Sequence, residues 1–179
     1  MAIGFGAIAP GNARASDGAK GALVEVSLLS PLFGAYNGYF FFRVAPSVAL
    51  GVVAGYSSVT DENAVSSTGW SVGLEANWFL TGSAIASGWR IVPSVRFLST
   101  QYTHGSGSAS DPHFDLGLEG GYRWVWGNGL TLGLSAGLGF QTHGKEITLS
   151  DGYTLVFNDF LQISSGLAPL ANISFGYAF

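Results

Sequence analysis

The sequence has little charge and no cysteine. Asp, Glu, Lys and Arg together make up 10% of its 179 residues, and only two residues are lysine. A soluble domain normally carries about a quarter charged residues, so this composition does not favour a surface that faces water on every side. The absence of cysteine excludes disulfides.

Long hydrophobic runs are also missing. No stretch approaches the roughly 18 consecutive apolar residues of a membrane-spanning helix, although 47% of the chain is apolar and the mean hydropathy is +0.35. The 27 glycines, together with Ser, Thr, Tyr, Phe and Val, favour strands. The sequence shows no basic patch, phosphate loop or metal-ligand spacing. We therefore predict no nucleic-acid partner, no cofactor and no metal.

Alternation of apolar with small or polar residues recurs along the chain at the spacing of membrane strands, which need about 9–11 residues each. Four segments alternate clearly, at 48–57, 70–78, 114–124 and 130–141. Four more, at 21–30, 38–46, 88–103 and 161–179, are less regular. The pattern predicts an all-β fold, an eight-stranded antiparallel up-and-down transmembrane β-barrel over residues 21–179.

The connections alternate in length. Tight turns are predicted at 45–47 and 127–129, and long loops at 58–68, 104–112 and 144–160. In outer-membrane barrels the short turns are periplasmic and the long loops extracellular. The connection at 80–88 is longer than a periplasmic turn requires. Because proline lacks an N–H, we expect β-bulges at Pro93 and Pro169.

Charged residues within the predicted strands share one face. A barrel with its apolar face outward places them in the lumen: Glu25, Arg43, Glu75, Arg90, Arg96, Asp115, Glu119 and Arg123. Four acids and four arginines make a neutral set, as burial requires. Folding of the hairpins predicts that Arg96 bridges Glu75 and Glu119, and that Glu25 lies beside Arg43. An eight-stranded barrel fills with side chains, so we interpret this network as a plug; the alternative is a gate or proton path.

Aromatic residues occur near the ends of the outward faces. They fit two girdles at the membrane interfaces: Tyr56, Trp70, Trp78, Trp89, Tyr122, Trp124 and Trp126.

The C-terminus has an aromatic residue at the last position and another aromatic residue two positions earlier. A polar residue lies seven positions before the last. Asn172, Phe175, Tyr177 and Phe179 follow this pattern, and Ser174 stands where glycine is usual. The ending resembles the assembly signal of bacterial outer-membrane barrels. Residues 21–179 are similar to the small eight-stranded family that includes the transmembrane domain of outer-membrane protein A and the X-type single-domain barrels.

That resemblance implies a location in the cell outer membrane, in contact with outer-membrane lipid and lipopolysaccharide. It also implies recognition by the barrel-assembly machinery through the last strand. The function it implies is structural or surface-interacting, without a wide pore, and with an unidentified ligand of the external loops. One such loop, 143–159, carries Tyr153, Leu155, Val156 and Phe157.

Residues 1–20 do not alternate. An apolar stretch followed by Asn12-Ala-Arg-Ala15 resembles the end of a secretory signal peptide, without a basic region before it. Either this is a signal-peptide remnant, with a mature chain starting near Ser16, or it is a periplasmic N-terminal tail.

Two other functions are open. The same barrel family includes lipid A-modifying enzymes that use His, Ser and an acid. Here His104, His113 and His143 fall on the extracellular side, and His143 could form a dyad with Ser150 or Glu146, but the His-x-Ser motif of the deacylases is absent. A soluble ligand-binding barrel is the third hypothesis.

Overall fold

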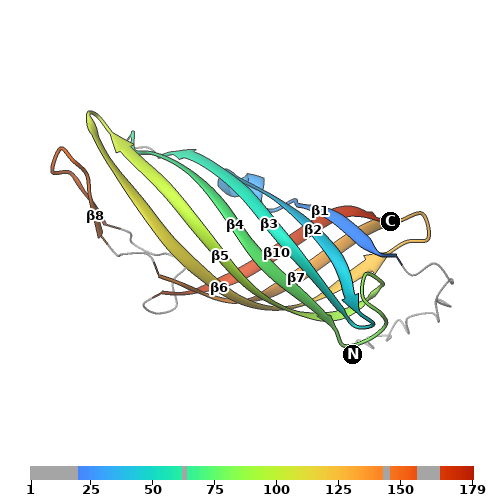
Figure 1. Ribbon diagram of the computed structural model, residues 1–179. Helices are drawn as coiled ribbons and strands as arrows, with labels where there is room; N and C mark the ends of the chain where they lie inside the picture. The colour runs from blue at the N-terminus through green and yellow to red at the C-terminus, as the bar shows by residue number, and fades with distance from the viewer. Residues whose placement is uncertain (1–19, 62–63, 143–145, 157–165) are drawn as a thin grey trace, which may run out of the picture.

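The computed structural model describes residues 20–61, 64–142, 146–156 and 166–179. Its strands are β1 (Ala22–Ser27), β2 (Ala35–Ala45), β3 (Val48–Thr60), β4 (Ser66–Phe79), β5 (Gly88–His104), β6 (Gly107–Val125), β7 (Leu130–Gln141), β8 (Glu146–Thr148), β9 (Thr154–Val156) and β10 (Leu167–Ala178), with a short 3-10 helix, η1 (Ser30–Phe33). Eight of the strands close into an antiparallel barrel in the order β1-β10-β7-β6-β5-β4-β3-β2 (Figure 1). The predicted fold class is confirmed. Of the predicted N-terminal segment, residues 1–20, all but residue 20 lie outside the described part.

The barrel is apolar outside and polar inside over most of its length. Outward residues such as Leu74, Leu118 and Leu134 are 60%, 58% and 39% exposed. The inward residues of the same strands are buried, among them Glu75, Glu119 and Arg123. Successive side chains of a strand point to opposite faces, so the alternation in the sequence becomes an inside and an outside.

The predicted loop at 104–112 is wrong. Strands β5 and β6 continue as a paired hairpin as far as His104 opposite Gly107, leaving a turn at residues 105–106 (Figure 1). Likewise β3 and β4 pair up to Thr60 opposite Ser66. Small polar residues suggested loops here, but backbone pairing continues through them. The segment 144–160 contains a second small hairpin, β8–β9, among its described residues.

The expected bulges at Pro93 and Pro169 are also wrong. Pro93 lies opposite Leu118 in an unshifted register, and Pro169 lies opposite Leu138 in another. The shift of register between β2 and β3 falls instead between Arg43 and Ala45. An N–H at position 169 would point to the edge of β10 that faces β1. β1 does not extend this far along β10, so Pro169 costs no ladder hydrogen bond and needs no bulge.

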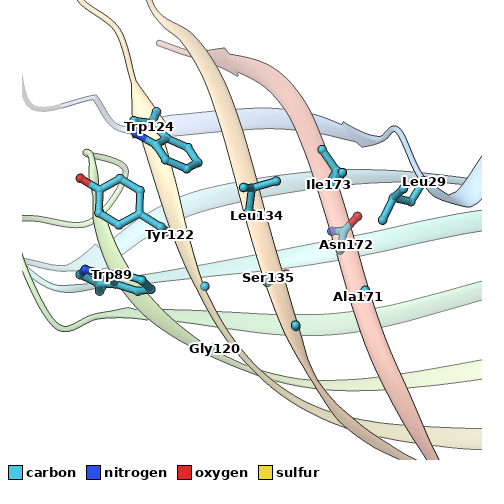
Figure 2. A pocket seen from close by; sticks show the side chains of 12 residues that line it. Leu29, Trp89, Gly120, Tyr122, Trp124, Leu134, Ser135, Ala171, Asn172 and Ile173 are labelled. Carbon is cyan, nitrogen blue, oxygen red and sulfur yellow. The ribbon is translucent and has the colours of Figure 1, made fainter. Parts of the chain in front are cut away.

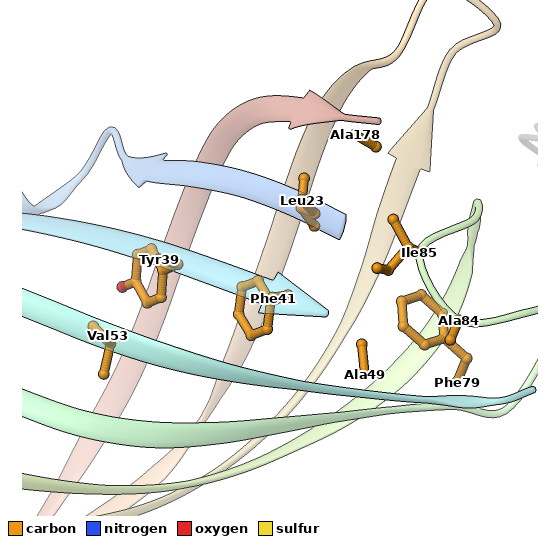
Figure 3. Close-up of a cluster of buried hydrophobic side chains, with 9 residues drawn as sticks. All are labelled: Leu23, Tyr39, Phe41, Ala49, Val53, Phe79, Ala84, Ile85 and Ala178. Carbon is orange, nitrogen blue, oxygen red and sulfur yellow. The ribbon is translucent and has the colours of Figure 1, made fainter. Parts of the chain in front are cut away.

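An apolar cluster closes the barrel at the end where β10 finishes. It consists of Leu23, Tyr39, Phe41, Ala49, Val53, Phe79, Ala84, Ile85 and Ala178 (Figure 3). Ala84 and Ile85 come from the β4–β5 connection, which turns back into the mouth of the barrel, where the N–H of Ala84 donates to the carbonyl of Pro46 at 2.7 Å. We call this cluster the apolar plug. The connection at 80–88 is longer than a tight turn because it supplies Ala84 and Ile85 to the apolar plug.

Candidate functional site

The most deeply buried ion pair crosses the lumen next to the apolar plug. Arg123 on β6 donates from Nε and Nη2 to the two carboxylate oxygens of Glu25 on β1, at 3.0 and 2.6 Å. The guanidinium also lies over the rings of Phe41 and Phe79, 5.2 and 5.7 Å from their centroids. Strands β1 and β6 are not neighbours, so this two-point contact joins opposite parts of the wall. A bidentate pair of this kind fixes both side chains.

The expected pair of Glu25 with Arg43 is therefore not formed, because Glu25 is held by Arg123. Tyr39 lies opposite Glu25 in the ladder, whereas Arg43 lies further along β2, on the same inward face and half-buried.

A second ion pair lies further up the lumen. Arg96 Nη2 is 2.5 Å from Glu75 Oε1, and the guanidinium is 5.6 Å from the centre of the Tyr39 ring. The expected bridge from Arg96 on to Glu119 is absent from the described residues, because Asp115 is the residue opposite Arg96. Glu119 instead accepts a hydrogen bond from the Ser135 hydroxyl at 2.6 Å.

Arg90 and Asp115 complete the lumen charges. Arg90 is 4% exposed and donates from Nη1 to Oδ1 of Asn77. Asp115 Oδ2 accepts from the Gln141 amide at 3.5 Å. Above them Asp111 Oδ2 lies 3.3 Å from His113 Nδ1, at the border of the predicted loop 104–112.

Two small cavities lie in the lumen among the described residues. One, of about 110 Å³, is lined by Ser30, Asn37, Glu119 and Asn172 among others. The other, of about 130 Å³, lies between Asn37, Arg96 and Thr100. Each has room for only a few water molecules, at about 30 Å³ each. Arg96 lines both cavities, and Tyr39 of the apolar plug also lines the first.

The predicted interfacial aromatics lie on the outside. The six predicted girdle residues other than Tyr122 are 37% to 58% exposed: Tyr56, Trp70, Trp78, Trp89, Trp124 and Trp126. Tyr122 is half-buried because its ring packs between those of Trp89 and Trp124, with centroids 5.3 and 4.7 Å away. Phe175, Tyr177 and Phe179 also face outward, while Asn172 faces the lumen and accepts from the Ser27 hydroxyl.

At the opposite end from the apolar plug, two hairpins pack together beyond the rest of the wall (Figure 1). The ring of His104 on β5 stacks on Tyr153, with centroids 4.2 Å apart. The backbone N–H of Ser108 on β6 donates to the Ser150 hydroxyl at 3.1 Å. We call the β5–β6 tip and the β8–β9 hairpin together the hairpin platform. Burial, and then the nearby carboxylate of Asp111, raises the pKa of the Tyr102 phenol inside it.

The predicted dyad of His143 with Ser150 or Glu146 falls partly outside the described residues, because it requires His143. Ser150 is hydrogen-bonded to β6, His104 is stacked, and His113 is buried beside Asp111. His143 and Phe157 lie outside the described part. Among residues 20–61, 64–142, 146–156 and 166–179 no group of three or more His, Asp or Glu could hold a metal ion. No helix in those ranges is long and apolar enough to cross a bilayer.

Sequence reasoning missed the apolar plug. Its signal was present in residues 39–42, Tyr-Phe-Phe-Phe, which are apolar on both faces of β2. Such a strand is buried on both sides, so the inward Tyr39 and Phe41 indicated an apolar layer in the lumen.

Comparison with known proteins supports the fold. No protein-family model matches the sequence, and no curated protein matches it either. Among solved structures, the chain is similar to neisserial surface protein A, with a TM-score of 0.55, 10% identity, and coverage of 88% of this chain and 94% of that one. The fold is that of the small eight-stranded outer-membrane β-barrels.

Proposed function

We propose that this protein is an integral outer-membrane β-barrel with a closed lumen, which presents the hairpin platform outside the cell as an interaction surface. The observation that carries the proposal is the inverted distribution of side chains. Large apolar residues face outward around the barrel, and the ion pairs Glu25–Arg123 and Glu75–Arg96 are enclosed. Only a surrounding bilayer makes such an exterior stable.

The orientation follows from the two ends. The end with the apolar plug has short connections at 46–47 and 126–129, as periplasmic turns do, and the other end has the hairpin platform. Outer-membrane lipid and lipopolysaccharide then contact the outward face. The barrel-assembly machinery recognises β10 through the aromatic pattern ending at Phe179.

The hairpin platform supports a role in interaction rather than in transport. β5 and β6 have 17 and 19 residues, more than the roughly 9–11 that a membrane strand uses. The surplus is paired and stacked against β8–β9, so it forms a surface with a defined shape. Pre-organisation of this kind reduces the entropic cost of binding a partner.

The membrane assignment is tested by a matched pair of substitutions in β7. Leu134→Arg places a charge on the outer face near mid-membrane and should cost about 2–4 kcal/mol, whereas Ser135→Arg places it in the lumen beside Glu119. Urea unfolding in lipid vesicles measures both. Equal costs would contradict the facing of β7, and a parent that dissolves without detergent and shows no heat-dependent gel mobility would contradict the membrane location.

The orientation is tested on intact cells. Protease added outside should cut a cleavage site inserted at Gly105–Ser106 and should not cut one inserted at Asn128. The reverse pattern would contradict the proposed orientation.

A further inference from the structure

The barrel wall has a seam at which backbone pairing stops. Toward η1, β1 pairs with β10 as far as Ser27 opposite Ser174, and one more hydrogen bond at this end joins Leu28 N–H to the Ile173 carbonyl at 2.7 Å. Beyond that point no described strand pairs with Leu167–Asn172 on this side. Backbone groups alternate sides along a strand, so the N–H and carbonyl of Ala171 point into the seam.

Side chains span the seam where the ladder ends. Ser27 Oγ donates to Asn172 Oδ1 at 2.9 Å, Ser30 Oγ donates to Ser27 Oγ at 2.8 Å, and Asn37 Nδ2 donates to Ser30 Oγ at 2.8 Å. This chain links β10 to β2 through the end of β1 and η1. Three side-chain hydrogen bonds are more easily rearranged than a backbone ladder, because each depends on a rotatable side chain.

An apolar groove of about 740 Å³ leads to the seam along the outside of the barrel (Figure 2). Its floor is one rung of small residues, Gly120 opposite Ala136 and Ala136 opposite Ala171. Trp89, Tyr122 and Trp124 border one end, and Leu29 and Ile173 lie at the other. Its volume is within the roughly 300–1,000 Å³ of ligand pockets.

The groove and the lumen meet at the seam. Ala171 and Asn172 line both the outer groove and the polar lumen cavity of about 110 Å³. An apolar space on the membrane side and a polar space on the lumen side are thus adjacent, with no backbone ladder of the described strands between β10 and η1. This combination matches the two parts of an amphiphilic molecule.

We propose that the seam binds a single-chain amphiphile from the surrounding bilayer, with its tail in the outer groove and a small head that donates hydrogen bonds in the lumen cavity. The proposal rests on the membrane location proposed above. A bilayer supplies the occupant, because the groove opens on the face that lipid covers. The cavity limits the head to a few non-hydrogen atoms, given about 30 Å³ for each water-sized group.

Charge decides what the head is. The cavity is lined by the carboxylates of Asp115 and Glu119 and by Arg96, whose guanidinium is already bonded to Glu75. Acids therefore outnumber bases around it. A hydroxyl or an ammonium is complementary to this lining, and a carboxylate is repelled by it.

The test uses quenching of the two tryptophans that border the groove. In a protein with Trp70→Phe, Trp78→Phe and Trp126→Phe, terminally brominated dodecanol should quench Trp89 and Trp124 in a saturable manner. Gly120→Leu fills the floor of the groove, where an added Cβ meets nothing within 4 Å. It should weaken binding about tenfold, the effect of excluding roughly two methylene groups. Ala54→Leu, on the outward face of β3, is the matched control and should leave binding unchanged.

The head is tested with two further probes. Bromododecane, which has no head, and brominated dodecanoic acid should each bind about tenfold more weakly than the alcohol. Asn172→Leu, or Asn37→Leu if the first variant does not fold, should remove the difference between alcohol and alkane. Equal binding of all three probes, or identical binding by Gly120→Leu and Ala54→Leu, overturns the proposal. Heat-dependent gel mobility of every variant shows separately whether the membrane barrel itself is intact.

Discussion

At the scale of single residues, a charge is tolerated in a strand when its side chain points into the lumen and not when it points outward to the apolar face. Each buried charge of the lumen needs a partner because an isolated one costs several kcal/mol. Arg123, fully buried, meets this need with two hydrogen bonds to Glu25, whereas Arg96 remains partly exposed beside a cavity. The two ion pairs therefore differ in how much their loss should cost.

We predict that Arg123→Met costs about 3–5 kcal/mol, the usual effect of leaving one buried charge without its partner. Arg96→Met should cost less because water in the adjacent cavity can solvate Glu75. The double variant Glu25→Gln, Arg123→Met removes both charges and should recover much of the loss. Urea unfolding in vesicles gives the free energies. A double variant no more stable than Arg123→Met would show that the charge left on Glu25 is not the cause.

Among the described residues, two that are not glycine have positive φ angles, and we predict that substitution by glycine has opposite effects at the two positions. Ala64 has φ 60° and is exposed, while Ile85 has φ 59° and is buried in the apolar plug. A left-handed backbone costs a residue with a Cβ about 1–2 kcal/mol. Ala64→Gly should therefore stabilise the barrel by about 0.5–1 kcal/mol. Ile85→Gly should destabilise it, because the buried side chain is worth about 2–5 kcal/mol. Thermal unfolding of the two variants checks the signs.

At the scale of elements, the sequence predicted the strands and their facing but not their length. Alternation is a local property, so β4, β6 and β7 could be read from their own residues. The upper part of the β5–β6 hairpin could not, because Gly107, Ser108 and Ser110 have the composition of a loop and are ordered by their pairing partners on β5. The pair of Arg96 with Glu75 could be predicted because the two residues lie on neighbouring strands of one hairpin. The pair of Glu25 with Arg123 could not, because β1 and β6 come together only when the barrel closes.

The paired tip predicts that the platform can be shortened without loss of the barrel. Deleting 101–104 together with 107–110 removes four rungs and joins the turn at 105–106 to the rung of Thr100 and Asp111. Folding should persist, since the facing of every remaining residue is unchanged. The β8–β9 hairpin loses the contacts of His104 and Ser108 and should become more sensitive to protease. Unchanged protection of β8–β9 would show that the two hairpins do not support each other.

At the scale of the whole molecule, the barrel is closed by two different layers in series. The ion pairs and their hydrogen bonds fill the middle of the lumen, and the apolar plug seals the end where β10 finishes. The second layer depends on how the β4–β5 connection returns to the mouth, a long-range feature that the local pattern around residues 80–88 does not contain. An eight-stranded barrel has an interior that side chains can fill, so we expect each layer alone to block ions.

This arrangement predicts how conductance responds to substitution. In planar bilayers the parent should give no steady single-channel current. Glu75→Gln with Arg96→Met should also stay closed, because the apolar plug is untouched, and Phe41→Ala with Ile85→Gly should stay closed because the Glu25–Arg123 pair still crosses the lumen. Conduction is expected only when Glu25→Ala and Arg123→Ala are added to these four changes, since both layers are then removed from the lumen. Steady current from the Glu75→Gln, Arg96→Met variant alone would mean that the plug does not seal the barrel and that the charge network acts as a gate.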